Sequence, residues 1–191
     1  MKRIFISLFI LATFLWAKNI AYSDEVISLY LNQNDTKVIG RLLPTNAFEI
    51  LKDQNDKVYI KINGYLNPKS PSVIYFNNSQ RIIVAAFSKN TKLNFSYIKK
   101  GKNGKWDQVS LKIWADKKDF AKDNKKMLKR AKELFTNNCG ICHTLHSEKE
   151  FNANAWPSVF RSMVNRTGID KKDQWLIIEY LQKNAKDFKT K

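Results

Sequence analysis

The segment Cys139-Gly140-Ile141-Cys142-His143 decides the interpretation of the C-terminal part of this 191-residue chain. Two cysteines three positions apart lie on one face of a helical turn, and a histidine follows directly. This C-x-x-C-H spacing is typical of c-type haem attachment. Each thiol adds to one vinyl group of the porphyrin, and the histidine then lies beneath the iron as a ligand. The segment predicts one covalently attached haem c, with Cys139 and Cys142 as attachment sites and His143 as the proximal iron ligand.

Three other interpretations of the motif fit less well. A thioredoxin-like redox pair requires a βαβ context, and the sequence does not show one. A zinc site using His146 as well would crowd four ligands into eight consecutive residues, unlike the usual paired-ligand spacing. A plain disulfide between Cys139 and Cys142 leaves His143 without a role.

A sixth iron ligand has to come from the opposite face of the haem. Met163 lies twenty residues after His143, which is enough chain to cross to that face. Met127 falls on the apolar stripe of the preceding helix, and His146 is too close to His143 to reach round. Met163 is therefore the candidate distal ligand. The alternatives are that it is a core methionine or that the iron is five-coordinate.

Several aromatic and basic residues near the motif are candidates for contact with the haem. Trp156, Phe160 and Trp175 could line the haem pocket or simply form the core. Arg161 and Arg166 could bind the propionates through charge-assisted hydrogen bonds or lie on the surface. A six-coordinate iron has no open position for substrate, which favours an electron-transfer protein over an enzyme.

The residues around the motif predict a small all-α domain over residues 127–191. A short helix is expected between Pro157 and Gly168, and an apolar stripe of a further helix follows Asp170, a good N-cap. Another apolar stripe precedes the motif and comprises Met127, Leu128, Ala131, Leu134 and Phe135. Three helices this small need a staple, and a haem would supply it. Residues 116–126 are charged and are expected to be a linker.

Residues 24–115 predict short strands instead of helices. Alternating apolar residues occur in 58–62, 93–97 and 109–113, and 82–87 is a continuous apolar run. Asn103-Gly104 is a strong hairpin signal. We expect six to eight strands in a small barrel or sandwich, so the chain as a whole is of the α+β class.

The first 23 residues have the pattern of a secretory signal peptide. A short basic start precedes the apolar stretch Ile4 to Trp16, and Ala21-Tyr22-Ser23 offers small residues for cleavage. The apolar stretch is shorter than a spanning helix requires, although an uncleaved anchor is the alternative. The segment predicts export to the periplasm.

The charge is strongly basic, with a formal net charge of +17. Export and the dominance of lysine over arginine argue against nucleic acid as a partner. The charge fits either a solvated surface or steering toward an acidic protein, with at most peripheral membrane contact. One candidate contact patch surrounds the expected hairpin and comprises Lys99, Lys100, Lys102 and Lys105.

From about Gly40 onward, the chain resembles the C-terminal part of the pentahaem c-type cytochromes of trimethylamine N-oxide respiration. The resemblance is carried by the motif with Leu145-His146 after it, by Asn154-Ala155-Trp156-Pro157, by Met163 and Arg166, and by Tyr180-Leu181-Gln182. Gly40-Arg41-Leu42-Leu43-Pro44 and Ile62-Asn63-Gly64-Tyr65 resemble the SH3-like part of the same region.

The resemblance implies a monohaem cytochrome that passes electrons to a molybdenum-containing N- or S-oxide reductase, with His143 and Met163 as the axial ligands. Family members carry four further haems in a membrane-anchored part that takes electrons from quinol. This sequence has a single C-x-x-C-H, so we expect a shuttle fed by a separate quinol-linked cytochrome. The alternatives are a general periplasmic carrier to an oxidase or peroxidase, a haem-based sensor, and a haem enzyme.

Overall fold

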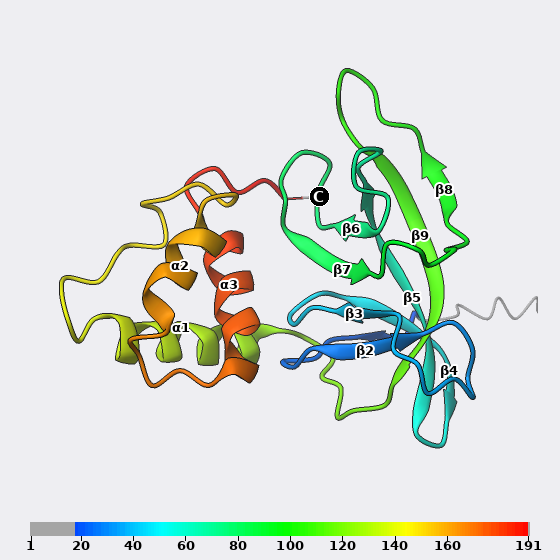
Figure 1. The fold of residues 1–191 in the computed structure, drawn as a ribbon, viewed down its shortest axis with the longest axis horizontal. Helices are drawn as coiled ribbons and strands as arrows, with labels where there is room; N and C mark the ends of the chain where they lie inside the picture. Colours follow the sequence, from blue (N-terminus) through cyan, green and yellow to red (C-terminus); the bar gives the residue numbers. More distant parts are fainter. Residues whose placement is uncertain (1–17, 191) are drawn as a thin grey trace, which may run out of the picture.

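The fold combines a β-barrel with a cluster of helices, as Figure 1 shows for the computed structural model, which describes residues 18–190. The barrel precedes the helices in the sequence, and the helices pack together at one end of it. This confirms the predicted α+β class with a small barrel followed by an all-α part. The strands are β1 (Ile20–Ala21), β2 (Ile27–Tyr30), β3 (Gly40–Leu42), β4 (Phe48–Gln54), β5 (Lys57–Leu66), β6 (Val73–Tyr75), β7 (Ile83–Phe87), β8 (Ser96–Lys99) and β9 (Asp107–Asp116).

Six antiparallel strands close the barrel in the order β5-β6-β7-β3-β2-β9, because β9 pairs again with β5. The β5–β9 pairing runs over ten residues of each strand, from Lys57↔Asp116 to Leu66↔Asp107. On β5 the predicted alternation holds, since Val58, Ile60 and Ile62 are all buried in the barrel core. Strands β1 and β4 extend the sheet beside β5, and β8 extends it beside β9.

The connection between β8 and β9 confirms one expectation and corrects another. Asn103 and Gly104 have φ values of 52° and 75°, the left-handed conformation that a tight turn of this kind needs. The alternating segment 93–97 is a strand only in its last two residues, because β8 begins at Ser96, and all residues of β8 are exposed. Leu93 and Phe95 instead pack from a loop against the barrel core, while Tyr97 is 56% exposed.

Three α-helices follow the barrel: α1 (Lys125–Cys139), α2 (Trp156–Val164) and α3 (Gln174–Lys183). Their apolar faces meet in a second core that includes Phe135, Trp156 and Phe160. The expected N-cap at Asp170 is displaced, because a 3-10 turn (Lys171–Asp173) comes before α3 and Asp170 makes no capping hydrogen bond.

The helices and the barrel meet at a buried polar junction. Glu179 on α3 is fully buried, and its Oε2 lies 2.9 Å from the Nζ of Lys183 one turn later. Asn46, in the barrel loop after β3, donates to the same carboxylate at 3.3 Å, and Lys183 donates to Thr45 Oγ1 at 2.8 Å. The second oxygen, Oε1, has no hydrogen-bond partner in the described part of the chain. We call these four residues the Glu179 junction.

Further contacts around the Glu179 junction join the two parts. Ile82, just before β7, is buried in the helical core and not in the barrel core. Arg130 on α1 forms ion pairs with Asp24 at 3.4 Å and with Asp173 at 2.6 Å. The connecting segment between β9 and α1 is itself tied to the barrel, because Ala121 pairs with Tyr22.

The predicted signal peptide is only partly within the described residues, since residues 1–17 lie outside them. Its last part forms β1, whose Ile20 and Ala21 pair with β4. Ala21 is 4% exposed and belongs to the barrel core. Cleavage after Ser23, as expected from the sequence, would remove this strand and its pairing with β4.

We predict that the Lys183→Met variant loses about 3–5 kcal/mol of unfolding free energy, because a buried carboxylate is left without its cation. Lys129→Met is the matched control, since Lys129 pairs with Glu133 at the same i,i+4 spacing but on the surface. Its cost should stay below about 0.5 kcal/mol. Urea unfolding at neutral pH measures both values, and equal losses would contradict the prediction.

The Glu179 junction also predicts a pH dependence. Burial raises the pKa of Glu179 above the usual range, although Lys183 and Asn46 oppose the rise. Above the ordinary value of about 4.3, the folded protein therefore binds more protons here than the unfolded protein does. The contribution of Glu179 to the unfolding free energy then falls as pH rises from this ordinary value toward the raised pKa of the folded protein.

Replacing Glu179 by Gln should remove that fall. Urea unfolding between about pH 4 and 8 should show a shallower decline for Glu179→Gln than for the unaltered protein. The exposed Glu133→Gln substitution should leave the pH profile unchanged. Identical profiles for all three proteins would contradict the prediction.

A third prediction concerns N-terminal processing. Ala17 places a small residue ahead of β1, so cleavage there would preserve the strand. We expect the exported protein to begin at Lys18, as intact-mass analysis would show. Ala17→Asp should block processing and Ser23→Asp should not, whereas a mature protein beginning at Asp24 would overturn this expectation.

Candidate haem-binding site

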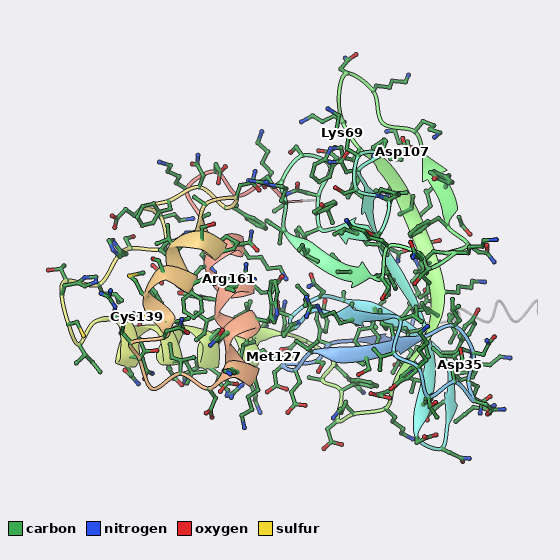
Figure 2. All side chains as sticks on the ribbon, viewed as in Figure 1. Asp35, Lys69, Asp107, Met127, Cys139 and Arg161 are labelled. Carbon is green, nitrogen blue, oxygen red and sulfur yellow. The ribbon has the colours of Figure 1, made fainter. Side chains whose placement is uncertain are left out.

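The first cysteine of the motif is placed by α1, of which Cys139 is the last residue. It is buried with Phe135 and Trp156 in the helical core, whereas Cys142 is exposed, and both are free thiols. Burial raises the pKa of the Cys139 thiol, which favours the protonated form. Figure 2 shows Cys139 at the end of α1 that points away from the barrel.

The imidazole of His143 is oriented by the backbone that follows it. Its Nδ1 lies 2.8 Å from the carbonyl oxygen of Thr144. A carbonyl oxygen can only accept, so Nδ1 donates this hydrogen bond, and in the neutral form of the ring the lone pair is on Nε2. Histidine ligands of metals commonly have their other nitrogen fixed in this way. The exposed His143 therefore presents Nε2 as a possible ligand atom.

The second histidine is engaged elsewhere. His146 Nδ1 lies 2.9 Å from the carboxylate of Glu150. Its ring packs edge-on against both His143 and Phe151, with centroid distances of 5.3 Å in each case. Because His146 and His143 lie side by side on one loop, His146 supports the loop and is not placed to reach the opposite side of a haem.

The loop that follows the motif is fixed to the helices through Glu148. Its backbone carbonyl accepts a 3.1 Å hydrogen bond from the indole of the fully buried Trp156, and its carboxylate accepts one from the Tyr180 hydroxyl. Burial alone would raise the pKa of Glu148, but the bond from Tyr180 and neighbouring charges lower it overall. Burial and Glu148 together raise the pKa of Tyr180. Sequence reasoning did not single out Glu148, since no motif marks it.

The two candidate methionines occupy different parts of the helical domain. Met127 is buried near the barrel end of α1, as Figure 2 shows. It precedes Cys139 by twelve residues, which is about 18 Å along a helix. This supports its assignment to the core. Met163 is partly buried near the end of α2, close in sequence to the buried Phe160 and Val164.

Trp175 and Arg161 are placed at the barrel junction. The Arg161 guanidinium lies 4.9 Å from the centroid of the Trp175 ring, and Arg41 of β3 lies 5.7 Å from the same ring. Trp175 thus contacts one arginine from α2 and one from the barrel. Arg166 is exposed. Arg41 was not among the candidate site residues, because nothing in the sequence relates it to α3.

The donor chemistry at the motif fits a haem c. Two free thiols at the required spacing flank Ile141, which is 75% exposed although it is apolar. The free Nε2 of His143 is the ligand atom that the haem iron needs. In residues 18–190, no three His, Cys, Asp or Glu side chains converge as a metal site, so the four residues weighed for zinc do not form one.

Helix α1 ends at Cys139, the first residue of C-x-x-C-H, and this motif is typical of c-type cytochromes. The chain belongs to the family described as the TorC third cytochrome c domain, whose family model matches residues 17–120. The matched range is the barrel and part of the connecting segment, so the haem motif lies beyond it. No solved structure is significantly similar to the chain.

Curated relatives extend the similarity across both parts of the chain. Cytochrome c-type protein TorC of Escherichia coli (strain K12) is 27% identical over 171 residues, which are 87% of this chain and 44% of that protein. Cytochrome c-type protein TorY of Haemophilus influenzae is 24% identical over 158 residues, or 81% of this chain and 43% of the relative. The chain thus spans less than half the length of either relative.

We predict that Cys139→Ala and Cys142→Ala each leave a single thioether to the haem. The unreacted vinyl group then stays conjugated with the ring, so the absorption band of the pyridine haemochrome should shift to longer wavelength. The double variant should carry no haem after denaturing electrophoresis. Covalent haem in the double variant would contradict the assignment of both cysteines.

Proposed function

We propose that this chain is a periplasmic monohaem c-type cytochrome that transfers electrons to a molybdenum-containing N- or S-oxide reductase. The observation that carries the proposal is the position of C-x-x-C-H directly at the end of α1, with the Nε2 of His143 left free. The similarity to TorC and TorY over most of the chain supports this reading. The family resemblance supports the class of acceptor.

Each site residue has a defined task in this proposal. Cys139 and Cys142 would hold the porphyrin through thioether bonds, and His143 and Met163 would be the ligands of its iron. Trp156 would line the haem pocket. When bound, haem supplies one-electron oxidation and reduction at its iron, and a His/Met ligand pair raises its potential.

The proposed route begins with a quinol-linked cytochrome as donor and ends at the reductase. Export places the chain where haem c is attached, in the periplasm. No helix in residues 18–190 is long and apolar enough to cross a membrane. The excess of basic residues, +17 over the full sequence and little changed by loss of Lys2 and Arg3, would accelerate encounter with acidic partners and make it sensitive to salt.

The test is a reoxidation experiment. The purified holoprotein is reduced and mixed with the N-oxide reductase of the same host, and trimethylamine N-oxide is then added while the haem spectrum is followed. We expect rapid oxidation that depends on the substrate. No oxidation by a reductase that is active with an artificial donor would reject this acceptor and favour a general carrier, for which an oxidase or peroxidase is the next acceptor to test.

We predict that Met163→Ala opens the sixth coordination position. The reduced variant should bind carbon monoxide and its midpoint potential should fall, because the thioether stabilises ferrous iron. Met127→Leu is the matched control, since it replaces a buried methionine near the barrel end of α1. If both variants behave like the unaltered protein in carbon monoxide titration, Met163 is not the ligand.

A further inference from the structure

Three adjoining hollows lie on the barrel. The largest, of about 700 Å³, is formed by the segment after β2 and the segment after β7. It shares Ser88 with a hollow of about 330 Å³ beside Arg41. It shares Leu31 and Lys92 with one of about 340 Å³ beside Lys112. We call the three together the β2–β7 groove.

The groove is rich in cations that have no carboxylate partner. In the described residues, none of the ion pairs within 4.0 Å involves the basic residues that line the groove. These residues are Lys37, Lys89, Lys92, Lys112 and Arg41. The one acidic residue, Asp35, already accepts hydrogen bonds from the backbone and side chain of Asn32.

Apolar side chains are exposed between these cations. Leu31 is 45% exposed and Val38 is 49% exposed, and both line the groove. The groove is both cationic and apolar, and it extends over several hollows. Such a surface is complementary to a polypeptide with negative charges and apolar side chains along its length. The surface of a lipid bilayer is flat. It would leave the hollows beside Leu31 and Val38 unfilled.

We propose that the β2–β7 groove binds an acidic, partly apolar polypeptide segment of a partner protein. The alternative basic surface at the β8–β9 hairpin is less suited, because Lys100 is paired with Asp107 at 2.8 Å. Figure 2 places Asp35, in the largest hollow of the groove, and Cys139, at the haem motif, at opposite ends of the molecule, while Arg41 in another hollow contacts Trp175 of α3. The groove would thus hold a partner without covering the motif.

Such a contact acts as a tether. A partner held at the barrel raises its own effective concentration near the haem domain without adding a contact at the site of electron exchange. The proposal rests on the barrel surface alone and does not depend on the identity of the electron acceptor.

The test uses the holoprotein and two fluorescein-labelled peptides of equal length and charge, one repeating Glu-Leu-Glu-Ser and one repeating Glu-Ser. Fluorescence anisotropy at low salt measures their affinities. The variant Lys37→Gln/Lys89→Gln/Lys92→Gln should bind the first peptide about tenfold more weakly. Its matched control, Lys99→Gln/Lys102→Gln/Lys105→Gln, removes the same charge from the hairpin and should change the affinity less than about twofold.

The apolar part of the proposal has its own readout. The unaltered protein should prefer the Leu-containing peptide, and Leu31→Ser/Val38→Ser should abolish that preference. Equal weakening by the two triple variants would show that net charge alone attracts the peptides, which overturns the proposal. A second result would also overturn it: the variant Lys37→Gln/Lys89→Gln/Lys92→Gln binds the peptides as before but no longer binds phosphatidylglycerol vesicles. The groove would then be a lipid-binding surface.

Discussion

The buried carboxylate of Glu179 is the constraint on which the arrangement of the two parts depends. A charged or half-satisfied carboxyl group inside a protein is costly unless its partners are held in place. Here Lys183 on the same helix and Asn46 on the barrel contact the carboxylate, and Thr45 on the barrel accepts a hydrogen bond from Lys183. Separating the helices from the barrel would leave Glu179 without half of these contacts, so the two parts behave as one unit.

Helix α3 connects that constraint to the haem motif. Tyr180 directly follows Glu179 and donates to Glu148 in the loop after the motif. The same Glu148 accepts the indole hydrogen of Trp156. The barrel thus fixes α3, α3 fixes the loop, and the loop carries His143. Attachment of the haem to the end of α1 would then place it in a fixed orientation relative to the barrel and its groove.

Local patterns were sufficient for most of the architecture and for the motif. The alternation in β5 and the apolar stripe of α1 predicted their buried faces, because each depends on a single element. The Glu179 junction could not be predicted in this way. The apolar stripe of α3 contains Ile177, Ile178 and Leu181. Glu179 lies outside this stripe, and it would face solvent if the barrel did not cover the other side of the helix. The contact of Arg41 with Trp175 has the same origin, since residues far apart in the sequence meet only in the assembled fold.

The central claim is that one haem is held between His143 and a methionine on α2. The proton NMR spectrum of the reduced holoprotein tests it most directly, because a methyl group bound to the iron lies over the porphyrin ring and is strongly shielded by the ring current. The account predicts one three-proton signal far upfield, which disappears in Met163→Ala. A spectrum without such a signal, or one in which the signal survives that substitution, would contradict it.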